Sequence, residues 1–161
     1  MAIKRNLGVL RFDNARIIYR NFAGAKTDFN RAGARNFALI IESEELAQSM
    51  IADGWNVKMK PPRDENEDSF YYLPIKVNFN GNGPYVVLSV RGIDTILDES
   101  NIDKLDKLNI DRIDLDVRAG YYDVNGKKGV SAYLDGMKVW QRYNRFEIID
   151  DDEKNPDGAP L

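Results

Sequence analysis

Apolar and polar residues alternate along much of the chain, and the clearest alternation lies in residues 70–79. Leu73, Ile75 and Val77 fall on one side of this segment, with more polar residues between them. A repeat of two residues places alternate side chains on opposite faces of an extended chain, so the segment is predicted to be a half-buried β-strand. Pro74 has no backbone N–H and therefore indicates an edge strand or a bulge.

The same pattern predicts further strands, joined by turns. They cover residues 36–41, 55–60, 84–91, 112–121 and 129–141, after one or two strands within residues 7–22. Residues 80–83 (NGNG) predict a hairpin turn, and Asn125-Gly126 predicts a second one. Asp135-Gly136 interrupts the alternation of the last strand, which indicates a bulge.

Helical spacing occurs in only two short segments. Ser43 is a suitable N-cap and Gly54 a suitable C-terminal residue for a helix over residues 44–53. A second helix is predicted over residues 100–108. Residues 23–34 show no periodicity and contain two glycines, so we predict a mobile loop there.

The order of these elements matches an OB-fold, a small Greek-key barrel of five strands. The helix over residues 100–108 would lie between the third and fourth barrel strands, and residues 44–60 would be an insertion. Alternation with one polar face argues against a parallel α/β sheet. We therefore predict a mainly β fold: an OB-fold-like small barrel with two short helices in residues 1–149, followed by a disordered acidic C-terminal tail at residues 150–161.

Composition narrows the chemistry that the chain can perform. Its 161 residues include no Cys and no His, which excludes thiolate nucleophiles, Ser–His pairs and metal sites built on those ligands. Neither a GxGxxG nor a GxxxxGK[ST] motif occurs. We therefore expect a binding protein with no cofactor and no metal. The enzyme alternative is a metal-dependent nuclease using Asp114 and Asp116, or residues 150–152. A solvated strand face is the more common explanation of the first pair, and the tail aspartates lack a scaffold.

Charge is unevenly distributed, although the formal net charge is only −3. Residues 1–36 hold eight Lys and Arg against two Asp, whereas residues 147–161 hold six Asp and Glu against one Lys. This asymmetry indicates a basic functional surface and an acidic interaction tail, centred on Asp150, Asp151, Asp152 and Glu153. The simpler interpretation is that both are solvated faces.

Basic and aromatic residues are interleaved, which is the combination that single-strand binding requires. Cations follow the nucleic-acid backbone, and bases stack on aromatic rings. The candidate nucleic-acid-binding residues are Arg16, Tyr19, Arg20, Lys26, Phe29, Arg31, Arg35, Lys58, Tyr72, Lys76, Tyr122, Lys127, Lys128 and Trp140.

Several of the aromatic residues also have a structural interpretation. Phe22 and Trp55 lie in apolar strands and are expected in the core, and Tyr121 continues the inward phase of its strand. Lys127 and Lys128 at a turn would serve solubility equally well. Phe29 is different, because a loop rich in Gly and Arg has little reason to expose a Phe unless a base or a partner subunit covers it.

The chain resembles the small OB-fold single-stranded DNA-binding proteins of phages and prophages. The similarity lies in RNFAGAKTDFNRAGARNFAL, DGWNVK, LDVRAGYYDVNGKKGVSAYLDGMKV and the acidic end IIDDDEKNP. The resemblance implies sequence-tolerant binding of single-stranded DNA in phage replication or recombination. It also implies that the acidic tail recruits replication or recombination proteins and competes for the DNA groove. Bacterial relatives end in an apolar tip closing on Phe, whereas this chain ends in Gly158-Ala159-Pro160-Leu161.

A non-enzymatic protein-interaction module, such as a virion or regulatory protein using the same barrel surface, is the main alternative. A homodimer is left open beside the monomer. The opening residues lack the apolar run of a secretory signal, and no segment is long and apolar enough to span a membrane. We therefore expect no membrane partner and a location in the cytoplasm of a host cell.

Overall fold

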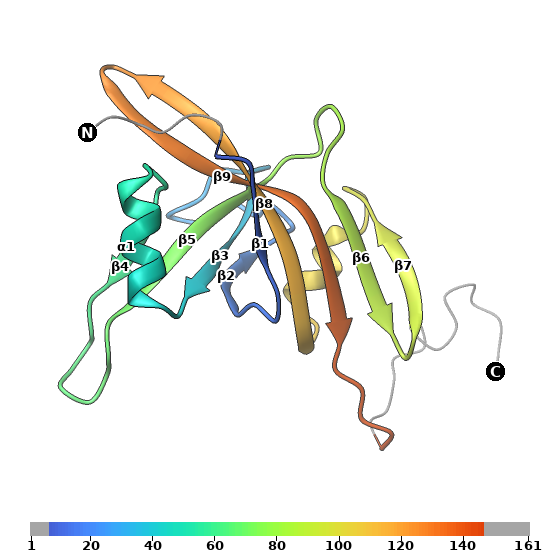
Figure 1. The fold of residues 1–161 in the computed structure, drawn as a ribbon. Helices are drawn as coiled ribbons and strands as arrows, with labels where there is room; N and C mark the ends of the chain where they lie inside the picture. Colours follow the sequence, from blue (N-terminus) through green and yellow to red (C-terminus); the bar gives the residue numbers. More distant parts are fainter. Residues whose placement is uncertain (1–6, 147–161) are drawn as a thin grey trace.

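The computed structural model describes residues 7–146, which fold mainly into β-strands (Figure 1). The elements in chain order are β1 (Val9–Phe12), β2 (Ile17–Asn21), β3 (Arg35–Ile41), α1 (Glu44–Ala52), β4 (Lys58–Lys60), β5 (Phe70–Val77), β6 (Tyr85–Val90), β7 (Ile93–Leu97), the 3₁₀ helix η1 (Ile102–Asp106), β8 (Ile110–Val124) and β9 (Lys127–Gln141). The predicted acidic tail lies outside the described residues.

The strands form one mixed sheet whose main path runs β1-β8-β9-β5-β3-β2. Strands β5 and β6 run parallel to β9, and the other pairs are antiparallel. The two end strands, β1 and β2, are consecutive in the chain. Between them the Ala15 N–H donates to the Ile113 carbonyl (2.7 Å), and the Ile40 N–H donates to the Arg16 carbonyl (2.9 Å). The prediction of a mainly β, barrel-like fold is confirmed, although the ladder of paired strands stays open between β1 and β2.

The predicted hairpin at residues 80–83 is wrong. Strand β9 is 15 residues long and accepts two strands in succession along one edge. Its residues Ala132 and Tyr133 pair with β5, and its stretch from Gly136 to Trp140 pairs with β6. Residues 78–84 therefore carry the chain from one parallel neighbour of β9 to the next, without the reversal of direction that a hairpin makes.

A hairpin that the alternation did not predict lies one strand later. Strands β6 and β7 are antiparallel, with Val90 opposite Ile93. The two turn residues, Arg91 and Gly92, both have positive φ (52° and 80°). These angles suit a two-residue turn whose twist matches that of the flanking strands. Strands β6 and β7 lie off the main path of the sheet. The expectation that residues 84–91 form the third barrel strand is therefore wrong.

Helix α1 begins and ends as its sequence predicts. The Ser43 side chain accepts a hydrogen bond from the Leu46 N–H (3.1 Å). At the other end Gly54 has φ +99°, and the Trp55 N–H donates to the Met50 carbonyl (3.0 Å), as in a Schellman motif. The second predicted helix is only the short 3₁₀ segment η1.

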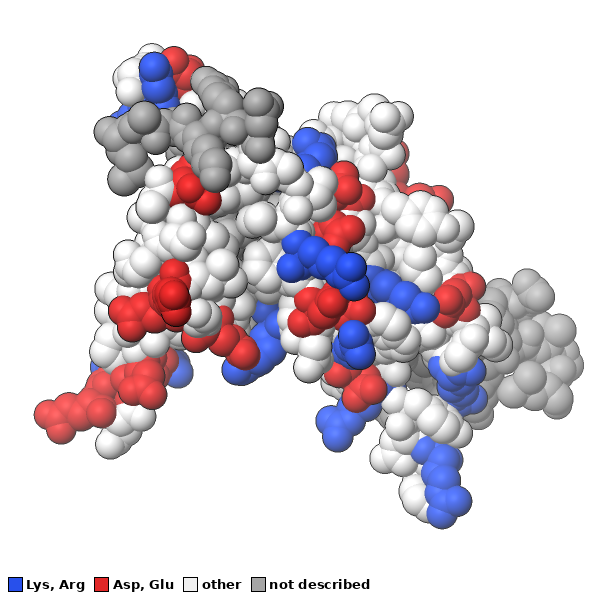
Figure 2. Space-filling model, viewed as in Figure 1, with Lys and Arg blue, Asp and Glu red and all other residues white. Residues whose placement is uncertain are grey.

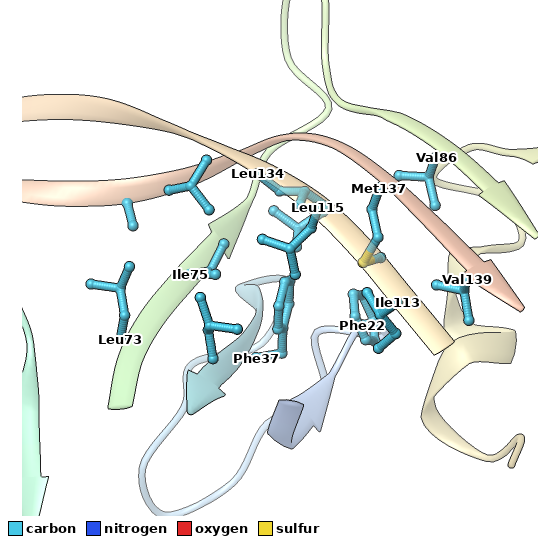
Figure 3. Packing of buried hydrophobic residues seen from close by; sticks show 14 of the residues in the cluster. Phe22, Phe37, Leu73, Ile75, Val86, Ile113, Leu115, Leu134, Met137 and Val139 are labelled. Carbon is cyan, nitrogen blue, oxygen red and sulfur yellow. The ribbon is translucent and has the colours of Figure 1, made fainter. Parts of the chain in front are cut away.

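The hydrophobic core lies inside the curved sheet, and Figure 3 shows its central side chains pointing toward one another. The inward residues of β5, Leu73 and Ile75, are fully buried, as the alternation predicts. The rings of Phe22 and Phe37 stack with centroids 5.0 Å apart. Trp55 is also buried, as expected.

Pro74 marks no bulge, because β3 and β5 pair in unbroken register on both sides of it. Pro74 pairs with β3 but lies between the last β4 contact and the first β9 contact of β5, so its missing N–H interrupts neither ladder. In β9, Asp135 is an extra residue between two register positions, which confirms the predicted bulge.

Within residues 7–146, no helix has the length and apolarity needed to cross a bilayer.

Candidate nucleic-acid interface

The outer face of β5, β8 and β9 carries a cluster of aromatic rings and cations. Because alternate residues point outward, the inward positions of these strands form the core while their neighbours form this surface. We call it the tyrosine face and define it by Tyr19, Lys58, Lys60, Phe70, Tyr72, Lys76, Arg118, Tyr122 and Tyr133.

One end of the tyrosine face centres on Tyr72. Its ring makes an edge contact with Tyr19 (centroids 5.7 Å apart) and a tilted contact with Phe70 (6.0 Å). Lys60 Nζ donates to the Tyr19 hydroxyl (3.1 Å), and Lys58 lies directly opposite Tyr72 in the ladder of β4 and β5. Three aromatic rings and two ammonium groups therefore lie together in this part of the surface.

Tyr19 reaches this cluster from an irregular strand. The pairing of β2 with β3 shifts register between Ile18 and Asn21, and Tyr19 has a left-handed backbone (φ 54°). A bulge of this kind re-aims a side chain, and the left-handed conformation is unfavourable for a residue with a Cβ. Strained positions of this type concentrate at functional sites.

The middle of the tyrosine face is Tyr133. Lys76 on β5 and Arg118 on β8 are its register partners on the two sides of β9. The Lys76 ammonium lies 5.7 Å from the ring centroid and the Arg118 guanidinium 4.8 Å, which are cation–π distances. Within residues 7–146, the structure gives neither cation a carboxylate partner at ion-pair distance.

An open hollow of about 430 Å³ lies beside Tyr133, at the base of the hairpin of β8 and β9. Three tyrosines, a lysine and two small polar side chains line it, so it offers stacking surfaces, a positive charge and hydrogen-bonding groups together. Its lining consists of Asn56, Lys76, Gly120, Tyr121, Tyr122, Val124, Ser131 and Tyr133. The hairpin itself projects beyond the rest of the sheet (Figure 1).

Two of the arginines predicted to bind DNA have structural partners. Arg20 Nη1 donates to the carbonyls of Leu105 and Leu108, both at 2.8 Å, at the end of η1. Arg35 Nη1 donates to the Phe22 carbonyl (2.6 Å). Both guanidinium groups therefore tie β2 and β3 to neighbouring backbone, and the structure does not bring them to the tyrosine face.

The loop between β2 and β3 is held by its own hydrogen bonds. The Asn30 side-chain amide donates to the carbonyls of Ala25 and Ala34 (both 2.9 Å). Phe29 lies at the tip with 99% of its surface exposed. Lys26 and Arg31 are exposed on the same loop. These three predicted residues form a basic and aromatic cluster next to β3 that is separate from the tyrosine face.

The remaining cations among the candidates lie in two places. Arg16 Nη1 forms an exposed ion pair with Glu42 (3.3 Å). Lys127 and Lys128 stand at the tip of the hairpin of β8 and β9, whose turn has the predicted Asn125-Gly126 conformation with positive φ at both residues. Lys128 Nζ is 3.9 Å from the Asp123 carboxylate.

Trp140 lies about 20 Å farther along β9 than Tyr133, beyond the bulge. Its ring is flanked by Arg112 (5.3 Å) and Lys138 (4.8 Å). Both cations are paired, Arg112 with Asp114 (3.0 Å) and Lys138 with Asp94 (3.1 Å). The structure therefore places this predicted residue apart from the tyrosine face.

A second open hollow, of about 460 Å³, lies in this part of the sheet. We call it the aspartate groove; its lining consists of Tyr85, Val87, Asp114, Leu115, Asp116, Asp135, Gly136, Met137 and Lys138. Figure 2 shows Lys and Arg next to Asp and Glu over the region of β1, β8 and β9, so neither sign dominates there. Among the described residues no cluster of His, Cys, Asp and Glu could hold a metal ion.

Asp114 is bound by two donors on its own side of the sheet. Arg112 Nε donates to Oδ1 (3.0 Å), and the Asn14 N–H donates to the same oxygen (2.8 Å). These hydrogen bonds, chiefly that from Arg112, hold the pKa of Asp114 below its ordinary value. Arg112 Nη2 also donates to Oδ2 (3.2 Å), so both carboxylate oxygens already accept hydrogen bonds, which weighs against the Mg²⁺ alternative.

Four residues of the tyrosine face were not predicted from the sequence: Lys60, Phe70, Arg118 and Tyr133. Tyr133 and Arg118 share the outward phase of their strands with Ser131 and Gly120, so alternation alone contained the signal. Only the pairing of β5 with β9 shows that Lys76, Tyr133 and Arg118 form one row across three strands.

A basic and aromatic surface on a β-sheet scaffold is typical of proteins that bind single-stranded nucleic acids. The chain belongs to one such family, whose model is described as "Putative phage ssDNA-binding domain" and matches residues 2–147. The predicted resemblance to phage single-stranded DNA-binding proteins is therefore confirmed. None of the curated proteins compared with the chain matches it significantly.

Solved structures of the single-stranded DNA-binding protein from bacteriophage Enc34 share the fold. The C-terminally truncated form has a TM-score of 0.56 at 10% identity, over 88% of this chain and 90% of that one. The untruncated form gives 0.56 at 10% identity, over 92% and 90%. The form in complex with ssDNA gives 0.55 at 9% identity, over 88% and 91%.

Proposed function

We propose that the chain binds single-stranded DNA without sequence preference, along the tyrosine face. The observation that carries this proposal is the row of Lys76, Tyr133 and Arg118 across β5, β9 and β8. In this row two cations flank one aromatic ring, and neither has a carboxylate partner among residues 7–146. A row of this kind offers a base a stacking surface and offers the flanking phosphates positive charge at the same point.

The strand would extend from the Tyr72 end of the face to the hairpin. Tyr72, Tyr133 and Tyr122 supply the rings, since every base has a π-face that can stack on them. Lys58, Lys76 and Arg118 neutralise phosphates. The loop that carries Phe29 and the hairpin of β8 and β9 correspond to the two loops that flank the ligand in OB-folds.

The test is a titration of a fluorescently labelled dT oligonucleotide of about 16 nucleotides, followed by anisotropy at low and at moderate salt. We expect salt-sensitive binding, because neutralised phosphates release counterions, and much weaker binding of a duplex of the same length. The variant Tyr72→Ala with Tyr133→Ala should bind more weakly than Tyr85→Ala with Tyr143→Ala, whose tyrosines are exposed elsewhere. Equal binding by the two double variants would contradict the proposal.

The family context extends the proposal to phage DNA replication or recombination in the host cytoplasm, with a non-enzymatic role in covering single strands. In this scheme residues 1–149 are the binding domain. The acidic segment 150–161 recruits replication or recombination proteins and competes with DNA for the basic face. A chain truncated after residue 149 should then bind dT more tightly at low salt, and unchanged affinity would contradict the competition.

A homodimer remains part of the proposal as one assembly state. Within the described residues 7–146, strand β7 pairs only with β6, and it exposes Ile93 and Ile96, so it is the edge that a second copy could meet. Light scattering after size-exclusion chromatography distinguishes monomer from dimer directly. A dimer that survives Ile93→Lys with Ile96→Lys would exclude this edge.

A further inference from the structure

Two glycines on the hairpin of β8 and β9 have no conformational reason to be glycine. Gly120 and Gly129 both occupy outward positions of the ribbon, and neither has a positive φ. A residue with a side chain could therefore adopt either backbone conformation. The lack of a side chain must therefore leave space above the backbone for another group.

That space is filled by tyrosine rings. A Cβ atom on Gly120 would overlap the ring of Tyr133, and one on Gly129 would overlap the ring and hydroxyl of Tyr122. Tyr122 lies directly opposite Gly129 in the ladder, and Tyr133 reaches diagonally from its partner Arg118 to Gly120. Gly129 is buried although it faces outward. Each ring therefore rests against the backbone of the neighbouring strand.

We propose that Gly120 and Gly129 are positioning residues of the DNA-binding surface, which hold the rings of Tyr133 and Tyr122 against the ribbon so that a base meets an already ordered platform. The inference rests on the proposed function of the tyrosine face. A ring that rests on backbone has its position fixed before a ligand arrives. Side-chain ordering on binding weakens affinity, so a ring that is ordered beforehand binds more tightly.

Alanine at either glycine should move a ring without unfolding the domain. The atoms that a new Cβ would meet belong to the far end of a tyrosine side chain, which can rotate away into solvent. We expect Gly120→Ala and Gly129→Ala each to weaken dT binding by about 2- to 10-fold, the cost of ordering one such side chain.

Gly136→Ala is the matched control. Gly136 also lies in β9 without a positive φ, but a Cβ there would meet only the Tyr85 carbonyl oxygen at 3.5 Å, an ordinary contact. Affinities for the dT oligonucleotide are measured for all three alanine variants, and for Gly120→Ala and Tyr133→Ala alone and combined. Proton NMR of the Gly120 Hα resonances reports ring seating, since a tyrosine ring above them shifts these signals upfield.

The expected result is weaker binding by Gly120→Ala and Gly129→Ala, unchanged binding by Gly136→Ala, and no further loss when Gly120→Ala is added to Tyr133→Ala. Non-additivity of this kind shows that the glycine acts through the ring. Wild-type affinity of Gly120→Ala, or an equal loss in the Tyr133→Ala background, would overturn the positioning role. Wild-type affinity of Tyr133→Ala itself would overturn the proposed DNA-binding face, and the positioning role with it.

Discussion

The two halves of the β8–β9 ribbon use the same strands and similar residues for different surfaces. In the hairpin half, Tyr133 is flanked by Lys76 and Arg118, which have no carboxylate partner among the described residues. In the half beyond the bulge, Trp140 is flanked by two cations that are paired with Asp114 and Asp94. Aromatic rings beside cations thus occur in both halves, and only the pairing of the cations separates them.

This difference shows why composition alone does not locate a nucleic-acid surface. A phosphate that approaches the Trp140 half must displace a carboxylate that already holds the cation, and it also meets the field of the aspartate groove. A phosphate that approaches Lys76 or Arg118 on the tyrosine face displaces no carboxylate of the described residues 7–146, only weak cation–π contacts. The comparison can be tested by changing equivalent residues in the two halves.

The largest effect is expected from removing the cations of one half at a time. Lys76→Ala with Arg118→Ala should weaken dT binding about 100-fold or more, because two charge-assisted contacts of about 1.5–3 kcal/mol each are lost. The slope of log K against log salt should also fall by about 1.4, or 0.7 per phosphate contact on a single strand. Arg112→Ala with Lys138→Ala should change neither quantity appreciably. Anisotropy titrations over a salt series measure both, and equal losses in the two double variants would erase the distinction.

The next effect concerns the aromatic rings. Tyr122→Ala should cost about 1–3 kcal/mol of binding free energy, the range for one lost base stack. Trp140→Ala removes a larger ring but should change the binding free energy by less than about 0.5 kcal/mol, as for a surface position outside the interface. Both variants are compared by the same titration, with thermal unfolding as the check on folding. A larger loss for Trp140→Ala would move the binding surface beyond the bulge.

A smaller effect should follow from neutralising the aspartate groove. Asp116→Asn with Asp135→Asn removes two negative charges that lie outside the tyrosine face, so it should tighten dT binding by only about 2- to 3-fold at low salt. The gain should vanish at moderate salt, since distant exposed charges are then screened. A gain that persists at moderate salt would mean that DNA contacts the groove directly.

The smallest effect is the pH dependence of Asp114. Its pKa is lowered in the folded state, mainly by the hydrogen bond from Arg112. The carboxylate therefore contributes stability above its unfolded pKa, roughly 3.9, and loses that contribution as pH falls through the lower folded pKa. Asp114→Asn should be slightly less stable than wild type at pH 7, with the difference shrinking below pH 4, as urea unfolding at both pH values would show. DNA affinity at pH 7 and moderate salt, where the charges of the aspartate groove are screened, should be unchanged.

Local patterns predicted the elements well where the reason for the element is local. The cap at Ser43, the Gly54 terminus, the Asn125-Gly126 turn and the Asp135 bulge all depend on a few adjacent residues. The hairpin expected at residues 80–83 failed, because the partner of β6 is β9, which lies some 50 residues later in the chain. The sequence offered no local sign of that pairing.

The binding surface was predicted in kind more than in detail. Tyr72, Lys76 and Tyr122 were predicted correctly as outward-facing residues, because the alternation along their strands shows which positions point outward. Tyr133 was missed because its value depends on neighbours from two other strands. Arg20 and Arg35 counted as free cations in the sequence, whereas in the structure their guanidinium groups satisfy backbone carbonyls.

The extra residue at Asp135 changes which residues of β9 face the core. Before it, the even-numbered residues Ala132 and Leu134 face the core; after it, the odd-numbered residues Met137 and Val139 do. Deleting that one residue would restore a single alternation along β9. The side chains that face the core after residue 135 would then point outward. The bulge therefore reverses the side-chain phase within one strand, and the boundary between the tyrosine face and the aspartate groove lies at this reversal.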